Sequence, residues 1–209
     1  MFDDRTDAGD RLAAELDRRG IEADVVLGIP RGALPVARPV ADALGADLDV
    51  VVARKMGAPN NPELALGAVA SDGSVWRNEA LIDRLGVSET YVDDIRTEEA
   101  ENARTKADRY RETDGLPDLD DKRVVVVDDG VATGATATAC LRQVRDAGAE
   151  RVVLAIPVGS PDSVERLERE ADDVIALRTP QNFRAVGQFY REFGQVTDEE
   201  AIEYLDRTR

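Results

Sequence analysis

The chain has 209 residues and a formal net charge of −16 at pH 7, with 43 acidic residues, 27 basic ones and no histidine. Such an acidic surface disfavours binding to DNA or RNA. The absence of histidine excludes a histidine base, a Ser-His triad and a His-ligated metal site. The single Cys140 excludes an intramolecular disulfide and suits a reducing compartment. No long apolar run and no basic-apolar leader is visible, so we expect a soluble, cytoplasmic protein with no membrane segment.

The basic residues include only three lysines, which are Lys55, Lys106 and Lys122. An acidic, lysine-poor surface resembles that of proteins from salt-accumulating halophiles, which stay soluble where neutral surfaces precipitate. Molar salt also screens charges over about 3 Å, which would let an anionic substrate approach so acidic a protein. The composition therefore suggests, as a hypothesis, a halophilic protein.

The first quarter of the chain alternates between helix and strand patterns. Apolar spacing predicts an amphipathic helix over residues 4–19 and a strand over 23–28. A second helix is expected over about 32–44, followed by a second strand over 48–54.

The same alternation resumes in the second half of the chain. The predicted strands and helices there are, in order, strand 124–128, helix 135–147, strand 151–156, helix 161–170 and strand 173–177. This βα alternation predicts an α/β fold with a doubly wound parallel sheet. A length of 209 residues fits a single domain over residues 1–209.

Two segments lie outside this alternation. The first, about 57–115, contains an expected hairpin (64–70 with 74–77) and a long polar helix from about 88 to 111. It is too long for a simple connection, so we expect a lid or an oligomer arm. The second, about 179–195, is an irregular aromatic segment, and a helix beginning near Thr197 follows it.

Residues 124–136, VVVVDDGVATGAT, carry the strongest functional signal. Four valines predict a strand buried on both faces, and Asp128 and Asp129 must then lie at the carboxyl edge of the sheet, where such folds bind ligands. The small-residue loop that follows opens a helix, an arrangement suited to phosphate. Because carboxylates would repel phosphate, they face another part of the ligand, and ribose hydroxyls fit. An ordinary capped strand–turn–helix is the simpler alternative.

This stretch resembles the signature of the type I phosphoribosyltransferases, which has four apolar residues, two acids and a Thr-Gly loop that closes on a Thr. The resemblance implies that Asp128 and Asp129 hold the ribose and contribute to catalysis. It also implies that the loop anchors the 5-phosphate through Val131, Ala132, Thr133, Gly134, Ala135 and Thr136.

The predicted first strand ends in a glycine-bracketed turn with an Arg, which could form a second anion site. Alone it is a plain βα turn, but beside the first motif it resembles the family's pyrophosphate loop, which implies pyrophosphate contacts for Pro30, Arg31 and Gly32. The second strand ends in Arg54 and Lys55. This pair resembles the cations that open the mobile loop of orotate-type members, so we expect both at the pyrophosphate and a closing loop from residue 57 onward.

The predicted long helix carries Arg104, Lys106 and Arg109 among acidic neighbours. We interpret these cations as part of a solvated helix face with i,i+4 ion pairs.

The aromatic segment 179–195 gathers Phe183, Phe189, Tyr190 and Phe193 in a chain with only 4% aromatic residues. It resembles the variable hood of the family, in which a Phe stacks on the base, so Phe183 and Val186 are the expected base contacts. An aromatic patch that covers the sheet edge or forms a dimer is the alternative.

One position departs from the hypoxanthine–guanine type of this family. That type has an Asp directly before the Thr-Gly of the loop, whereas this chain has Ala132, as in adenine- and orotate-type loops. The identity of the acceptor base, a purine or a pyrimidine, therefore stays open.

The resemblance implies a Mg²⁺-dependent transferase of nucleotide salvage that moves a 5-phosphoribosyl group from phosphoribosyl pyrophosphate to a nitrogenous base and releases pyrophosphate. The metal would be held through the substrate's pyrophosphate, with Asp128 and Asp129 as candidate contributors. Family analogy also favours a homodimer. The alternatives are a non-catalytic regulator that senses the metabolite and acts on a protein partner, and a hydrolase or phosphorylase that uses the same site.

Overall fold

A five-stranded parallel sheet forms the body of the computed structural model, which describes residues 1–111 and 115–206. The strand order is β2-β1-β6-β7-β8, and each neighbouring pair is parallel. The strands are β1 (Val25–Gly28), β2 (Asp47–Val50), β6 (Arg123–Val127), β7 (Arg151–Val158) and β8 (Asp173–Arg178). The expected doubly wound parallel sheet is confirmed.

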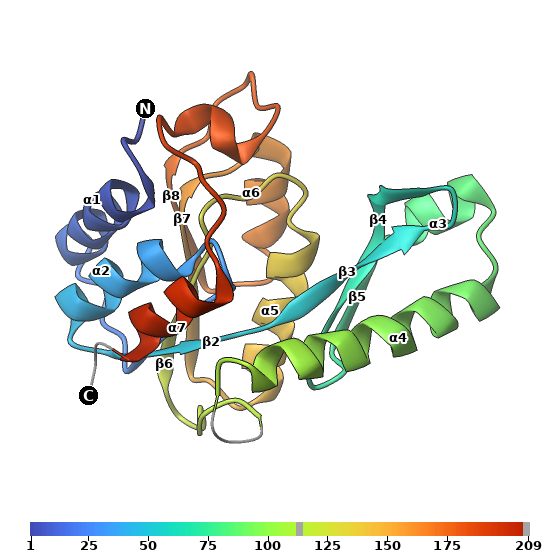
Figure 1. Ribbon diagram of the computed structural model, residues 1–209, viewed down its shortest axis with the longest axis horizontal. Helices are drawn as coiled ribbons and strands as arrows, with labels where there is room; N and C mark the ends of the chain where they lie inside the picture. Colours follow the sequence, from blue (N-terminus) through green and yellow to red (C-terminus); the bar gives the residue numbers. More distant parts are fainter. Residues whose placement is uncertain (112–114, 207–209) are drawn as a thin grey trace.

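Helices cover both faces of this sheet (Figure 1). One face carries α1 (Arg5–Arg18) and α2 (Leu34–Leu44), and the other carries α5 (Ala135–Asp146) and α6 (Pro161–Leu167). The valines of β6 alternate between the two cores: those at 125 and 127 pack with α1 and α2, and those at 124 and 126 pack with α5. Burial on both faces is the physical reason for the run of four valines.

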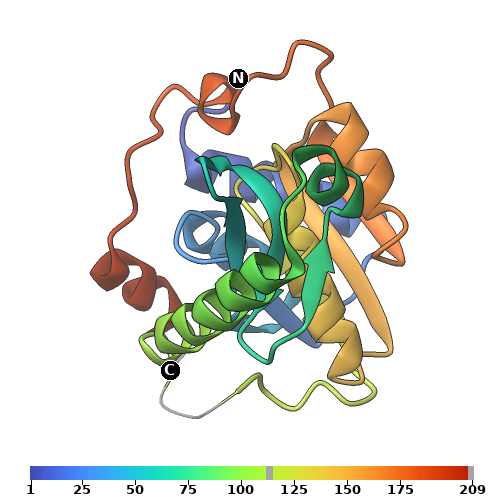
Figure 2. The same ribbon diagram turned by 90° about the vertical axis from the view of Figure 1, so that its right-hand side faces the viewer.

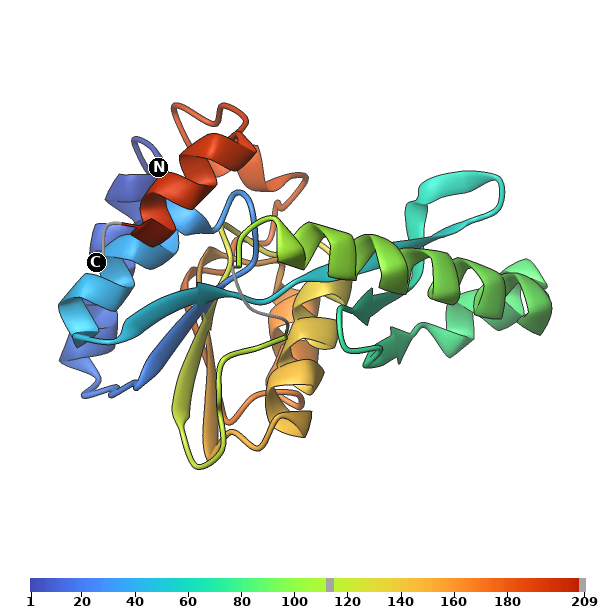
Figure 3. The same ribbon diagram turned by 60° about the horizontal axis from the view of Figure 1, so that its bottom comes forward.

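The predicted insertion forms an arm that projects from the body, as Figures 1 and 3 show. Its elements are β3 (Ala53–Ala58), β4 (Asn61–Ala70), β5 (Val75–Arg77), α3 (Glu79–Leu85) and α4 (Glu89–Asp108). The three strands make an antiparallel sheet, so the predicted hairpin is confirmed. The predicted long helix is also confirmed, although residues 112–114 of the expected insertion lie outside the described residues.

One expectation for the start of the arm is wrong. The strand expected over 48–54 is two strands, because β2 ends at Val50 and the chain enters the second sheet at Ala53. The apolar run continues across this junction, so hydrophobicity gives no sign of the change of sheet. The closing loop expected from residue 57 begins as the end of the β3–β4 hairpin, in which Ala58 pairs with Asn61, and its closure stays a prediction.

The C-terminal segment crosses the carboxyl edge of the parallel sheet and lies beside the N-terminus (Figure 2). Phe2 anchors it, since its N–H donates to the Phe189 carbonyl at 2.8 Å and it bridges to Tyr190. A short 3₁₀ helix, η1 (Val186–Phe189), and the helix α7 (Asp198–Asp206) follow the body. The helix expected near Thr197 is therefore confirmed. Among the described residues, no helix combines the length and apolarity that crossing a membrane requires.

Candidate active site

The two carboxylates of the acid pair, Asp128 and Asp129, lie directly after β6, at the carboxyl edge of the sheet. The Asp129 N–H donates to Asp128 Oδ1 at 2.9 Å, which links the two residues. Asp129 is also held from outside: Arg5 Nε of α1 lies 2.8 Å from its Oδ2, and the Tyr190 hydroxyl donates to its carbonyl at 2.5 Å. A Cβ added at Gly32 would lie 2.2 Å from the same Oδ2, so this close approach requires glycine.

The two carboxyls differ in their surroundings. Burial, and then the neighbouring charge of Asp129, raises the pKa of Asp128 well above its ordinary value. Burial also raises the pKa of Asp129, while the charge of Arg5 acts in the opposite direction. Because Asp129 has the guanidinium, the negative charge is better placed there, and Asp128 keeps its proton to higher pH.

The loop that follows turns its carbonyls toward β7 and α6. The Ala132 carbonyl accepts hydrogen bonds from Ser160 Oγ at 2.8 Å and Ser163 Oγ at 2.7 Å, and the Thr133 carbonyl accepts one from Arg166. Among the described residues, the backbone N–H groups of residues 132–136 donate no hydrogen bond. Unpaired donors at the start of α5 form an anion cradle.

Val131 differs from the rest of the predicted phosphate loop. Its N–H donates to the Val158 carbonyl at 2.9 Å, and its side chain is buried. Gly134 precedes α5 with a φ of 72°, in the left-handed region that favours glycine. The loop is therefore pinned at its beginning, and the free donors are those of residues 132–136.

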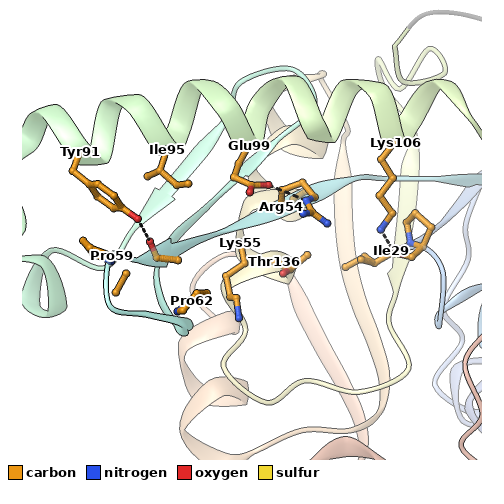
Figure 4. Close-up of a pocket in the computed structure, with 14 residues that line it drawn as sticks. Ile29, Arg54, Lys55, Pro59, Pro62, Tyr91, Ile95, Glu99, Lys106 and Thr136 are labelled. Atoms are coloured by element: carbon orange, nitrogen blue, oxygen red, sulfur yellow. Dashed lines mark hydrogen bonds and ion pairs between the residues drawn. The ribbon is translucent and has the colours of Figure 1, made fainter.

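A cavity of about 510 Å³ opens beside this loop, between the turn after β1, the β3–β4 hairpin and α4 (Figure 4). It brings together four residues that the sequence proposed for the site, namely Pro30, Arg54, Lys55 and Thr136. Arg31 is exposed and faces Asp198 of α7 at 3.6 Å instead. Arg54 pairs with Glu99 of α4 at 2.9 Å.

The expectation of a solvated α4 face is wrong for Lys106, which is half-buried, whereas Arg104 and Arg109 are exposed. Lys106 enters the cavity and donates to the Pro30 carbonyl at 2.7 Å, and Arg104 donates to the Ser71 carbonyl at 3.0 Å. One weak sequence signal marks Lys106 and is shared by Arg109: neither residue has an acid at i−4 or i+4, where a helix-face ion pair needs one.

The expected hood, residues 179–195, lies over the phosphate loop. A Cβ added at Gly130 would lie 2.6 Å from Val186 Cγ1, so Val186 sits directly on the loop. The ring of Phe183 packs on that of Phe189, with centroids 5.4 Å apart. Val186 therefore lies beside Gly130, directly after the acid pair, and Phe183 packs within the same C-terminal segment.

Arg5 is a site residue that the sequence did not reveal. Besides its bond to Asp129, it donates to the Gly194 carbonyl at 2.7 Å, and its guanidinium stacks 3.8 Å from the centroid of the Phe193 ring. It therefore joins α1, the acid pair and the hood. Its partner Asp129 lies 124 residues away in the chain, so no local sequence pattern predicts the contact.

Comparison with known proteins identifies the family of the chain. A family model described as the phosphoribosyl transferase domain matches residues 3–193. The chain belongs to the phosphoribosyl transferase domain family. The match includes the acid pair and residues 179–193 of the expected hood.

Among the relatives, a protein of Mycobacterium tuberculosis H37Rv that is named only provisionally as a phosphoribosyl transferase is 45% identical over 208 residues. That alignment covers 99% of this chain and 47% of the relative, so the chain spans about half the length of this curated relative. The uracil phosphoribosyltransferase of Streptomyces griseus is 38% identical over 76 residues, 36% of this chain and 34% of that enzyme. The crystal structure of TT1426 from Thermus thermophilus superposes with a TM-score of 0.82 at 45% identity, over 98% of this chain and 97% of that one.

The raised pKa of Asp128 predicts that this phosphoribosyl transferase domain gains stability when the carboxyl is replaced. In Asp128→Asn the amide oxygen can still accept from the Asp129 N–H, but no charge has to be buried. We expect the free energy of unfolding at pH 7 to rise by about 1 kcal/mol, and the melting temperature by roughly 2–4 °C. Wild-type stability falls as pH rises from about 3.9 toward the raised folded pKa, so the gain should shrink at pH 4. Thermal unfolding at both pH values measures this.

Asp198→Asn is the matched control for that experiment. The hydrogen bond from Tyr110 and the charges of Arg31 and Arg109 lower the pKa of Asp198, so its ionised form contributes stability above the unfolded pKa. This variant should melt at the same or a lower temperature at pH 7. If Asp128→Asn also melts lower than the wild type, the assignment of the proton to Asp128 is wrong.

The contact of Arg5 with Asp129 predicts strong coupling between the two side chains. Arg5→Met keeps the aliphatic packing over Phe193 but leaves the Asp129 carboxylate without its cation. In a double-mutant cycle with Asp129→Asn, denaturant unfolding should give a coupling of about 0.5–3 kcal/mol.

The exposed pair of Arg191 and Asp3 supplies the control cycle. Its nitrogen and oxygen are also close, at 2.9 Å, but its side chains are 69% and 60% exposed, against 12% and 15% for Arg5 and Asp129. Its coupling should be near zero. Equal couplings in the two cycles would contradict a special role for Arg5.

Proposed function

We propose that this chain forms the active site of a Mg²⁺-dependent phosphoribosyltransferase of nucleotide salvage. It would move the 5-phosphoribosyl group of phosphoribosyl pyrophosphate to a ring nitrogen of a purine or pyrimidine base and release pyrophosphate. One observation carries this proposal. Within the described residues, a loop of unpaired backbone N–H groups at the start of α5 directly follows two carboxylates at the end of a buried strand.

The two halves of that arrangement suit the two ends of a ribose phosphate. The 5-phosphate would accept hydrogen bonds from the N–H groups of residues 132–136 and from the hydroxyl of Thr136. The ribose hydroxyls would donate to Asp128 and Asp129. The acid pair would thus bind the ribose, and the loop would bind the 5-phosphate.

The leaving pyrophosphate would lie at the turn formed by Pro30, Arg31 and Gly32. Negative charge builds on it as the bond to carbon-1 of the ribose breaks, while the sugar passes through an oxocarbenium-like state. Arg54 and Lys55 line the cavity beside this turn, so they would stabilise the developing charge. The proposed catalysis therefore depends mainly on electrostatic stabilisation of the charge that develops on the leaving pyrophosphate.

The residues present fit a Mg²⁺ ion that is shared with the substrate. Among the described residues, no group of three or more His, Cys, Asp or Glu side chains is arranged to hold a metal. Mg²⁺ is commonly held by one or two carboxylates together with substrate phosphates, and Asp128 and Asp129 meet that need. When bound, the ion would neutralise charge on the pyrophosphate.

The acceptor base would bind under the hood, against Phe183 and Val186. The similarity to a uracil phosphoribosyltransferase covers only 36% of this chain, so it does not single out uracil. Purines, uracil and orotate all belong in the panel of bases to be tested.

Following pyrophosphate release from phosphoribosyl pyrophosphate, Mg²⁺ and that panel tests the proposal. We expect release that depends on one base. Release without any base would indicate a hydrolase, and binding without release would indicate a regulator. In Asp129→Asn we expect kcat/KM for the donor to fall tenfold or more, because about one charged hydrogen bond to the ribose is lost. Glu165→Gln, in an exposed ion pair, should leave kcat/KM unchanged.

We further propose that the protein is halophilic. With a net charge of −16 the acidic groups repel one another and also repel a polyanionic donor, and salt screens both effects. Raising KCl from low to multimolar concentration should therefore raise the melting temperature and lower KM for the donor. Equal stability and activity at both extremes would contradict the proposal. The cytoplasmic location and the homodimer stay predictions.

A further inference from the structure

The inserted helix α4 places one lysine inside the cavity of the candidate site. Figure 4 shows Lys106 pointing from α4 toward the turn after β1, and its Nζ donates to the Pro30 carbonyl at 2.7 Å. The residue is half-buried. A lysine ammonium has three N–H donors, so this bond leaves two for another acceptor.

The surroundings of Lys106 are cationic. Burial and then the charges of Arg54 and Arg31 lower its pKa. These two arginines each have a carboxylate within 4 Å, Glu99 for Arg54 and Asp198 for Arg31, whereas Lys106 has no ion pair among the described residues. The three cations line one cavity, and Lys106 is the one among them without a salt bridge in the described part of the chain, so together they form a position for a multiply charged anion.

Lys106 shares its cavity with Thr136 of the phosphate loop, and its charge lowers the pKa of Asp128. It therefore lies near both the turn after β1 and the loop that follows the acid pair. A second cavity of about 380 Å³, which Arg31, Arg54 and Arg109 also line, adjoins the first at Lys106. The lysine thus lies where the ribose and the pyrophosphate of the donor would join.

We propose that Lys106 binds the pyrophosphate group of the donor and that, through it, the inserted arm forms part of the active site. This inference rests on the proposed function. It adds a residue that lies outside the segments that resemble the family's motifs. The alternative is a purely structural tie in which Lys106 fastens α4 to the Pro30 carbonyl.

Calorimetric titration with two probes separates these roles. Inorganic pyrophosphate with MgCl₂ reports the proposed Lys106 site, and ribose 5-phosphate reports the phosphate loop and the acid pair. In Lys106→Met we expect pyrophosphate affinity to fall about tenfold, the loss of one charged hydrogen bond, with ribose 5-phosphate affinity unchanged. Lys106→Arg should recover most of the pyrophosphate affinity. Lys122→Met is the matched control, because Lys122 is exposed and precedes β6 at the opposite edge of the sheet.

The outcomes also separate this inference from the proposed function. A selective loss of pyrophosphate affinity in Lys106→Met supports the inference, even if the wild type transfers no base. Unchanged pyrophosphate affinity in that variant overturns the inference and leaves base transfer by the wild type unaffected. Loss of both ligands together with a lower melting temperature shows a structural tie and overturns it, as does a wild type that binds no pyrophosphate.

Discussion

The structure depends on holding two carboxylates at the end of a strand that is buried on both faces. β6 supplies apolar side chains to both cores, so the first polar residues after it stand at the edge of a desolvated region. A carboxylate charge in that position requires an opposite charge nearby. Arg5 of α1 supplies it, with its Nε 2.8 Å from Asp129 Oδ2. The close packing of Gly32 against Asp129 and the hydroxyl of Tyr190 on its carbonyl complete the arrangement. Three segments distant in sequence are thereby fixed around one carboxylate.

Much of this fold could be predicted because its signals are local. Four valines followed by two acids define a central strand and its end, and the helices over 5–18 and 89–108 follow from periodicity and capping. The phosphate loop is local too, since small residues and hydroxyls lie together in the sequence. The change of sheet after Val50 could not be predicted, because the residues on both sides of it are equally apolar.

The parts of the site that the sequence did not reveal depend on long-range contacts. Arg5 reaches the acid pair, and Lys106 reaches Pro30 across 76 positions of the chain. Both cations belong to amphipathic or polar helices, where an exposed position is the ordinary expectation for a charged residue. Only the fold shows which turn of each helix faces the cavity. A cation without an acid at i±4 is a weak signal, but in a chain with three lysines it has some value.

The charge distribution gives this site a specific form of selectivity. The protein carries −16 overall, yet Arg31, Arg54 and Lys106 converge on one position. An anion that binds Arg31 has to compete with Asp198, and one that binds Arg54 has to compete with Glu99. Each of these carboxylates lies within 4 Å of its arginine. A singly charged anion gains little binding free energy, because its ion pair with the arginine only replaces the one that the carboxylate made. A pyrophosphate can engage several cations at once, so it can offset the loss of both carboxylate contacts. The two acids therefore favour multiply charged ligands over singly charged ones, and Lys106 has no competing salt bridge among the described residues.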